Sequence, residues 1–307
     1  MIRIITTGRL GKEFAASLAE SKEKYTVRCV DEPVARDLGW ANCLAAFSAP
    51  EGVPLSGIEW IHSFGAGVEG FLKRDDISPN TIITRTVGRL GYRMGEFCLC
   101  HILNFFQHTF RVYDNKKQQA WEQNHPVSIA GKTVLILGTG EMAKGISHIL
   151  TQLKMEIFGV NTTGENPHTV FSRCIMFDQI ADVADRVSCI INTLPLSENT
   201  KRILDKDFFG LFNNALFINV GRGANVVEED LMRALAIKKI AFAVLDVFET
   251  EPLPETSPFW EQPNVFVSPH QAGLTDVDDI LESFREAHRC IQSSERNSLF
   301  VDVKRGY

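Results

Sequence analysis

The strongest constraint on the fold is an alternation from about residue 130 onward, in which short, nearly all-apolar runs are separated by amphipathic segments. Parallel strands that are covered on both faces have such apolar sequences. The segments between them carry apolar residues at the spacing of one helix face. The alternation therefore predicts a doubly wound parallel sheet. The predicted strands are residues 133–137, 157–160, 188–192, 216–220, 242–247 and 265–267, and the helical stripes are Ile146, Ile149, Leu150 and Leu153, then Leu231, Ala234 and Leu235.

The rest of the chain carries weaker signals of the same kind. A mostly apolar stretch at 92–112 has no Gly or Pro after Gly95, which predicts one long buried helix. The run Thr275-Asp276-Val277-Asp278 matches a capping box and predicts the start of a C-terminal helix. The remaining predicted elements are strands at 2–6, 44–47 and 58–64 and a helix at 12–20.

Composition narrows the class of protein. A chain of 307 residues suits about two domains, and 44% hydrophobic with 23% charged residues is ordinary for a globular protein. A net charge of -6 argues against nucleic acid as a partner, and no run reaches the roughly 18 apolar residues of a membrane span. The N-terminus lacks the apolar core of a secretion signal. Seven cysteines without recurring spacing predict neither disulfides nor a metal site, so we expect a cytoplasmic enzyme.

A glycine-rich turn directly follows the run at 133–137 and precedes a helix. Its sequence, Gly138-Thr139-Gly140-Glu141-Met142-Ala143, has the Gly-x-Gly-x-x-Gly/Ala spacing of dinucleotide-binding turns. The first Gly permits the tight turn, the second lets a phosphate approach bare backbone, and the small third residue lets the helix pack on the sheet. The helix N-terminus favours the pyrophosphate. The alternative is an ordinary glycine turn, but the flanking strand and helix favour the nucleotide site.

The residues expected at the adenosine ribose leave the cofactor open between NAD and NADP. An Asp or Glu about 20 residues after the turn would hold the ribose diol of NAD. This chain has Asn161-Thr162-Thr163 there, after the second predicted strand. No carboxylate repels a 2′-phosphate at this position, and no Arg attracts one. The sequence permits either cofactor and leans toward NADP.

Three further motifs follow the ends of later strands. They are Asn219-Val-Gly-Arg222-Gly, Leu245-Asp246-Val-Phe-Glu-Thr-Glu251-Pro-Leu-Pro and Ser268-Pro-His270-Gln-Ala-Gly273. In this order behind the glycine turn, they closely resemble the D-isomer-specific 2-hydroxyacid dehydrogenase family. The resemblance is dense from about 130 to 275 and extends weakly over nearly the whole chain. It implies two doubly wound α/β domains, a Rossmann nucleotide-binding domain and a flavodoxin-like substrate domain, with the active site in a cleft between them.

The resemblance implies a catalytic role for three residues. Arg222 matches the arginine that binds the substrate, and a planar guanidinium suits the carboxylate of a 2-oxo acid. His270 matches the acid/base, which would donate a proton to the carbonyl oxygen as hydride reaches C2. Glu251 matches its carboxylate partner. Taken singly, each residue would be an ordinary surface or loop residue.

The remaining expected site residues also follow from the resemblance. The loop Gly65-Ala66-Gly67 would offer backbone N–H groups to the substrate carboxylate. Asp246 would face the nicotinamide carboxamide, although an Asp that hydrogen-bonds at a strand end is the alternative. The other expected cofactor contacts are Thr193, Leu194, Pro195, Val220, Gly221, Ala272 and Gly273.

The resemblance also implies the domain organisation and the activity. Residues 1–95 and 277–307 would form the substrate domain, and residues 96–276 the nucleotide domain. The expected reaction is NAD(P)-dependent interconversion of a small 2-oxo acid and its D-2-hydroxy acid, with glyoxylate or hydroxypyruvate as the substrate. A homodimer is expected. Two alternatives stay open: a corepressor-like protein that senses NAD(H), and a short phosphoglycerate dehydrogenase.

Overall fold

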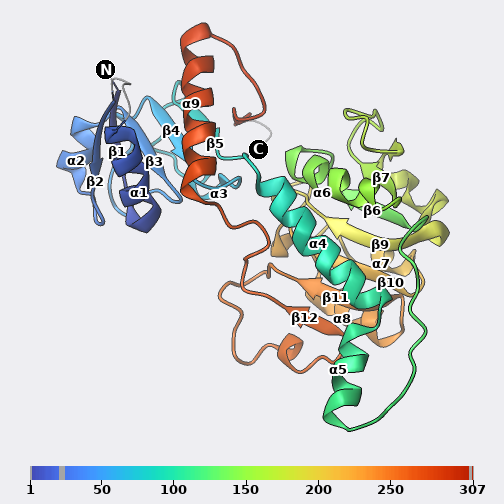
Figure 1. Cartoon of the computed structure of the whole chain (residues 1–307). Coiled ribbons are helices and arrows are strands. Elements are labelled where there is room, and N and C mark those ends of the chain that lie inside the picture. The colour runs from blue at the N-terminus through green and yellow to red at the C-terminus, as the bar shows by residue number, and fades with distance from the viewer. Residues whose placement is uncertain (1, 21–24, 304–305, 307) are drawn as a thin grey trace. The chain divides into compact units, whose positions relative to one another are not determined.

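The computed structural model describes residues 2–20, 25–303 and 306, and it divides the chain into two compact units (Figure 1). The first unit combines the described residues of Met1–Arg89 with those of Thr275–Tyr307, and the second unit is Leu90–Leu274. Each unit is built around one parallel sheet, so the predicted pair of doubly wound domains is confirmed.

The first unit has a five-stranded sheet in the order β2-β1-β3-β4-β5, the flavodoxin-like order. The C-terminal helix α9 belongs to this unit, where Phe284 stacks on Trp60 with ring centroids 4.4 Å apart. The strands are β1 (Ile2–Thr6), β2 (Tyr25–Cys29), β3 (Cys43–Ala46), β4 (Trp60–Ser63) and β5 (Ile82–Arg85), and the helices are α1 (Gly8–Ala19), α2 (Ala35–Trp40), α3 (Glu69–Leu72) and α9 (Val277–Ser293).

The second unit has a seven-stranded sheet in the order β12-β11-β10-β9-β6-β7-β8. Its first six strands along the chain follow the Rossmann order, in which the strand order reverses beside β6. The strands are β6 (Thr133–Leu137), β7 (Glu156–Val160), β8 (Arg173–Ile175), β9 (Val187–Asn192), β10 (Ala215–Asn219), β11 (Ile240–Leu245) and β12 (Val265–Val267). The α-helices are α4 (Leu90–Phe106), α5 (Thr109–Lys117), α6 (Glu141–Gln152), α7 (Lys206–Gly210) and α8 (Glu228–Ala236), and the 3-10 helices are η1 (Phe177–Asp182), η2 (Ala184–Arg186), η3 (Gly223–Asn225) and η4 (Pro258–Trp260).

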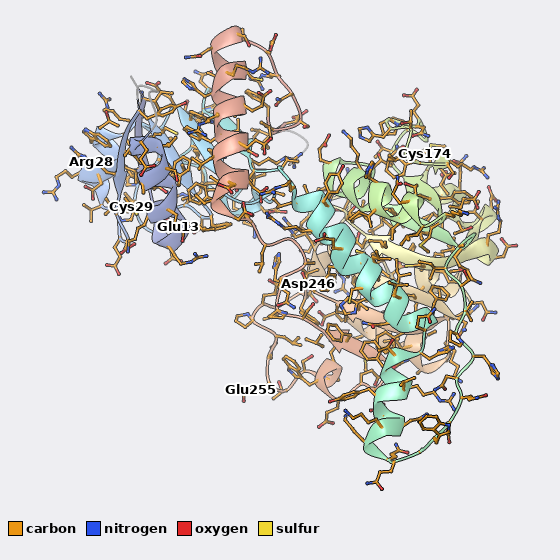
Figure 2. All side chains as sticks on the ribbon, viewed as in Figure 1. Glu13, Arg28, Cys29, Cys174, Asp246 and Glu255 are labelled. Carbon is orange, nitrogen blue, oxygen red and sulfur yellow. The ribbon has the colours of Figure 1, made fainter. Side chains whose placement is uncertain are left out.

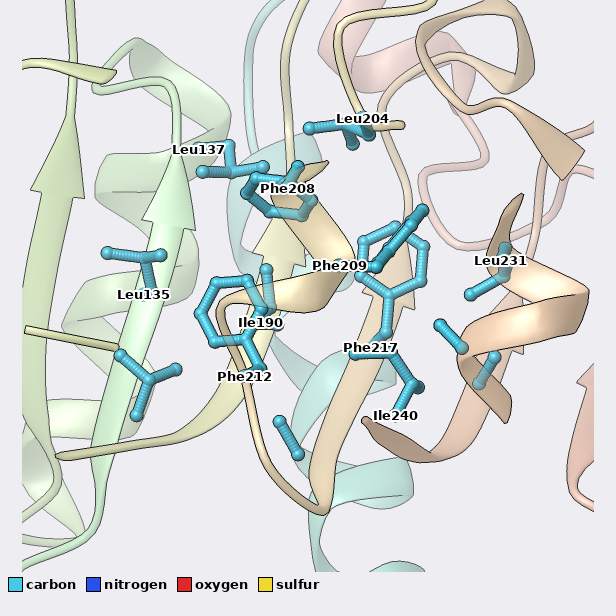
Figure 3. Packing of buried hydrophobic residues seen from close by; sticks show 14 of the residues in the cluster. Leu135, Leu137, Ile190, Leu204, Phe208, Phe209, Phe212, Phe217, Leu231 and Ile240 are labelled. Carbon is cyan, nitrogen blue, oxygen red and sulfur yellow. The ribbon is translucent and has the colours of Figure 1, made fainter. Parts of the chain in front are cut away.

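Both faces of the seven-stranded sheet are buried under helices, which explains the nearly all-apolar strands. On one face, phenylalanines from α7 and β10 pack edge to face, with the Phe209 and Phe217 centroids 5.3 Å apart (Figure 3). On the other face, α4 crosses α6 at glycines. A Cβ on Gly145 would lie only 2.4 Å from the backbone carbon of Gly91, so the two helices approach backbone to backbone. This crossing fixes the N-terminal end of α6, where the glycine turn lies.

The structure corrects the sequence prediction in three places. Strands β2, β5 and β8 were not predicted, and each is an edge strand of its sheet. The predicted single helix at 92–112 is two helices, because His108 adopts a left-handed conformation (φ 55°) between α4 and α5. The capping box of α9 is formed by Asp276 and Asp279, one residue later than predicted, because Asp276 rather than Thr275 adopts the N-cap conformation.

Candidate active site

The predicted glycine turn lies between β6 and α6 and is shaped to receive a phosphate. Gly138 has φ +98°, and a Cβ there would lie 2.8 Å from Oγ1 of Thr193, so only glycine fits. Gly140 is the N-cap of α6, and a Cβ there would meet no described atom within 4 Å. No side chain of the described residues caps this helix. Its first N–H groups, beside Glu141 and Met142, therefore fit a dinucleotide's pyrophosphate.

Asn161 closes the loop that follows β7 and ties it to the glycine turn. Its Nδ2 donates to Oγ1 of Thr139 at 3.1 Å and to the Glu165 carbonyl at 2.8 Å. Its Oδ1 accepts from the backbone N–H of Thr163 at 3.1 Å and of Gly164 at 2.7 Å. The side chain therefore shapes the loop, while Thr162 stays exposed beside it.

The loop Thr193-Leu194-Pro195 follows β9 next to the glycine turn. Both the backbone N–H and Oγ1 of Thr193 donate to the carbonyl of Leu137, at 3.0 and 2.8 Å. Leu194 donates its N–H to Oδ1 of Asn192 at 3.1 Å. These bonds hold the first two residues of the loop, Thr193 and Leu194, against the ends of β6 and β9.

Arg222 follows β10 in a loop held close to its neighbours. Val220 is buried, and its N–H donates to the Asn192 carbonyl at 3.2 Å. A Cβ on Gly221 would lie 2.9 Å from the Leu194 carbonyl oxygen, so this glycine permits a close backbone approach. The half-buried Arg222 side chain donates from Nη1 to the Gly221 carbonyl at 2.7 Å.

His270 and Glu251 form a direct pair. Nδ1 of His270 lies 2.8 Å from Oε2 of Glu251, and Oε1 of Glu251 accepts from the Phe248 N–H at 3.0 Å. The His270 backbone is left-handed (φ 50°), and its N–H donates to the carbonyls of Asp246 at 2.9 Å and Ser268 at 3.1 Å. The carboxylate therefore occupies Nδ1, and Nε2 is the ring nitrogen that does not face it.

Asp246 organises the loop that carries His270. It follows β11 at the carboxyl edge of the sheet (Figure 2) and is buried. Its Oδ1 accepts from Oγ of Ser268 at 2.6 Å and from the Gln271 N–H at 2.9 Å, and its Oδ2 accepts from the Ala272 N–H at 2.9 Å. Asp246 therefore hydrogen-bonds at the end of a strand, which is the predicted alternative to a contact with the nicotinamide carboxamide.

The loop Gly65-Ala66-Gly67 lies in the first unit, after β4. Oγ of Ser63 donates to the Gly67 carbonyl at 2.9 Å and accepts from the Gly65 N–H at 3.3 Å. Beside it is Phe47, a residue that the sequence did not single out, because an apolar residue after a strand is usually core. Phe47 is 54% exposed, and its ring lies 3.7 Å from a Cβ built on Gly65.

The structure therefore gathers the predicted residues of the second unit at one edge of its sheet, where the carboxyl ends of β6, β7, β9, β10, β11 and β12 lie. Gly273 completes the set, packed against Met94 of α4. In the described part of the chain, no group of three or more His, Cys, Asp or Glu residues could hold a metal ion, and no helix is long and apolar enough to cross a membrane.

The comparisons with known proteins agree with this geometry. Residues 99–272 match the model of the D-isomer specific 2-hydroxyacid dehydrogenase, NAD binding domain. The glyoxylate/hydroxypyruvate reductase A of Photorhabdus laumondii is 30% identical over 82% of both chains, and that of Serratia proteamaculans is 30% identical over 81% of this chain and 82% of the relative.

A solved structure extends the similarity to both units. The D-isomer specific 2-hydroxyacid dehydrogenase of Xanthobacter autotrophicus Py2, in complex with NADPH and MES, has a TM-score of 0.90 with 25% identity, covering 100% of this chain and 99% of the other. The fit of the glycine turn to a dinucleotide, the family model and these relatives lead to one conclusion. The chain belongs to the D-isomer-specific 2-hydroxyacid dehydrogenase family of NAD(P)-dependent oxidoreductases.

Proposed function

We propose that this protein reduces a small 2-oxo acid to the 2-hydroxy acid, with the D configuration where C2 becomes a stereocentre, and that glyoxylate or hydroxypyruvate is the substrate. The observation that carries the proposal is the 2.8 Å contact between Nδ1 of His270 and Oε2 of Glu251. Because Nδ1 is taken by the carboxylate in this contact, Nε2 remains for a reacting group. Relatives that are 30% identical carry the name glyoxylate/hydroxypyruvate reductase A, which supports this substrate class.

In the proposed reaction, His270 is the general acid. When bound, a reduced nicotinamide would supply the hydride that C2 receives. His270 would give its Nε2 proton to the carbonyl oxygen, which yields the alcohol and a neutral imidazole. Glu251 accepts a hydrogen bond from Nδ1 and offsets the positive charge of the protonated ring. Asp246 holds the backbone around His270 through its bonds to the 268–272 loop.

Arg222 is the proposed carboxylate-binding residue. A guanidinium presents parallel N–H donors that match the two oxygens of a carboxylate. One of its nitrogens already donates to the Gly221 carbonyl, which restrains the side chain close to its own loop. We assign the loop Gly65–Gly67 of the first unit to the same carboxylate, from the family resemblance.

We further propose that NADP(H) is the preferred cofactor. Asn161 is neutral where a carboxylate would repel a 2′-phosphate, and its amide is used within the loop that it shapes. The Xanthobacter relative of 25% identity was solved with NADPH. The proposal predicts a higher kcat/KM with NADPH than with NADH.

The function is tested with a panel of three 2-oxo acids: glyoxylate, hydroxypyruvate and pyruvate. Turnover of each is monitored by the loss of reduced-nicotinamide absorbance, with NADPH and with NADH. His270→Asn should lower kcat about 10²–10⁴-fold and leave cofactor affinity unchanged. His148→Asn, at an exposed position of α6, is the matched control. Turnover that survives in His270→Asn would refute the acid role, and no turnover of any 2-oxo acid by the wild type would refute the substrate class.

We also propose that the protein is a homodimer formed through α5 and the irregular segment that follows it. None of the α5 residues is buried, and Trp121 is 99% exposed. Val112, Tyr113 and Val127 add further exposed apolar surface. Large exposed apolar side chains close together in the sequence suggest an interaction site. Trp121→Ser should shift the sedimentation coefficient from dimer to monomer, and a wild type that sediments as a monomer would refute the proposal.

A further inference from the structure

Three buried asparagines, which we call the amide cluster, lie together at the carboxyl edge of the second unit. Asn192 ends β9, Asn219 ends β10, and Asn225 ends the 3-10 helix η3. All three are 0–1% exposed. An Asn at a strand end usually shapes a turn at the surface, so three of them in one buried group require a specific reason.

The amide cluster is connected by direct side-chain hydrogen bonds. Nδ2 of Asn192 donates to Oδ1 of Asn219 at 2.9 Å and to Oδ1 of Asn225 at 3.1 Å. Both donors of this amide group are therefore used inside the cluster. Buried amide groups that are hydrogen-bonded to one another in this way hold their side chains in a fixed arrangement.

The cluster also reaches two loops of the active site. On one side, Asn219 accepts from the Gly221 N–H at 3.2 Å and donates to the Arg222 carbonyl at 3.3 Å. On the other side, Asn192 accepts from the Leu194 N–H at 3.1 Å. Asn225 donates to the carbonyls of Pro195 at 3.3 Å and Thr200 at 3.0 Å.

Backbone contact joins the same two loops. A Cβ on Gly221 would lie 2.9 Å from the carbonyl oxygen of Leu194 and 3.0 Å from its nitrogen. A displacement of the 193–195 loop therefore displaces the loop before Arg222. The amide cluster is hydrogen-bonded to both loops and holds them in a fixed relative position. The first loop is expected to contact the cofactor and the second to carry the carboxylate-binding residue.

We propose that the amide cluster positions Arg222 relative to the 193–195 loop, so that binding of the cofactor strengthens binding of the 2-oxo acid and the reverse. This inference rests on the proposed role of Arg222. Coupling between two sites is reciprocal and typically amounts to about 5–150-fold in affinity. Asn225 is the residue that separates this role from general stability. Among the described residues, its side-chain amide bonds only to Asn192 and to the carbonyls of Pro195 and Thr200.

The test uses Asn225→Asp and Asn225→Leu in the full chain. The aspartate keeps the volume and the acceptor for Asn192, but it cannot donate to the carbonyls of Pro195 and Thr200. The leucine removes every bond without adding a charge. The control is Asn264→Asp, since Asn264 donates to the Ala241 carbonyl at 3.2 Å, beside the amino ends of β11 and β12.

The measurement is the Kd of NADPH, by fluorescence titration, with and without saturating oxamate, which carries a carboxylate beside a carbonyl that is not reduced. In the wild type and Asn264→Asp, oxamate should tighten NADPH binding within the range of about 5–150-fold. In both Asn225 variants this factor should fall toward one, while NADPH binding alone stays close to that of the wild type. Such a selective loss is a result that a purely structural role would not give.

Several outcomes would overturn the inference. The first three are a wild type in which oxamate does not change the Kd of NADPH, Asn225 variants that keep the wild-type change in Kd, and an Asn264→Asp control that loses this change. The fourth is failure of both Asn225 variants to fold, which would mean that the cluster serves only the stability of the core. Arg222→Gln separates this inference from the proposed function. Unchanged oxamate binding in that variant refutes the role of Arg222, whereas lost binding together with retained coupling in the Asn225 variants refutes the amide cluster alone.

Discussion

Gly223 lies directly against the backbone of Phe248, where a Cβ on the glycine would be 1.9 Å from the Phe248 carbonyl carbon and 2.0 Å from its oxygen. Gly223 follows Arg222, and the Phe248 N–H donates to Glu251 at 3.0 Å. This one contact therefore joins the loop of the proposed carboxylate-binding arginine to the loop of the glutamate that pairs with His270. Only a residue without a side chain permits it.

Gly223→Ala should accordingly lower both stability and turnover. The added methyl group forces the two loops apart, and overpacking of this kind costs about 1–3 kcal/mol. Chemical denaturation and kcat/KM with glyoxylate are the measurements. The control is Gly210→Ala, since a Cβ on Gly210 of α7 meets no described atom within 4 Å. Equal stability and turnover in the two variants would contradict the close approach.

Glu251→Gln should lower kcat. The amide has one acceptor oxygen where the carboxylate has two, so it cannot keep both the bond from Nδ1 of His270 and the bond from the Phe248 N–H. It also no longer offsets the charge of a protonated ring. Hydrogen bonds to charged groups are roughly twice as strong as neutral ones, and we expect kcat to fall about 10–100-fold. Glu255→Gln, at an exposed position of the same loop (Figure 2), is the control. A kcat that matches this control would exclude Glu251 from the mechanism.

The fold was largely predictable because central strands carry a strong signal. Strands β6, β9 and β10 are covered on both faces and read as apolar runs. The unpredicted strands β2, β5 and β8 lie at sheet edges, where one side has no neighbouring strand and polar residues such as Arg28 and Arg173 are tolerated. Local sequence does not distinguish such a strand from a loop.

The sequence motifs predict which residues make up the candidate site, but they do not predict the hydrogen bonds that hold these residues in place. The motifs identified Arg222, Glu251 and His270 through their order along the chain. The bonds of Asp246 to the 268–272 loop depend on the approach of two strand ends, which no local pattern records. For the same reason, Asn192 and Asn225 gave no sequence signal, because the partners that join them to the cluster and to Thr200 lie 25 to 33 residues away.

Asn161→Asp should move the cofactor preference from NADPH toward NADH. A carboxylate at this position would repel a 2′-phosphate and would accept hydrogen bonds from the hydroxyl groups of an unmodified ribose. We expect the ratio of kcat/KM for NADPH to that for NADH to fall about 10–100-fold, which corresponds to roughly 1.4–2.7 kcal/mol. Asn264→Asp adds the same charge at the opposite edge of the sheet and should leave the ratio unchanged. An unchanged ratio in Asn161→Asp would place the 2′-phosphate elsewhere.

Two buried histidines make stability depend on pH. His62 lies in the first unit beneath Thr84, with Nδ1 2.8 Å from its Oγ1, and burial lowers the pKa of His62 to about 3. His101 of α4 is 5% exposed and packs against Phe97 and Phe266. Burial lowers the pKa of His101 to about 4, although the negative charge of Asp246 acts to raise it. Both rings are therefore neutral in the folded protein at neutral pH.

The free energy of unfolding should consequently fall as the pH drops below about 6.5, because the unfolded chain then protonates both histidines while the folded chain does not. The loss continues to about pH 4 for His101 and about pH 3 for His62, and above pH 6.5 neither contributes. Each histidine adds at most about 1.4 kcal/mol per pH unit. Urea denaturation across this range should show a shallower decline for His62→Gln than for the wild type, whereas the exposed control His148→Gln should follow the wild type. Parallel declines in all three proteins would mean that His62 is protonated in the folded state or shielded from titration in the unfolded one.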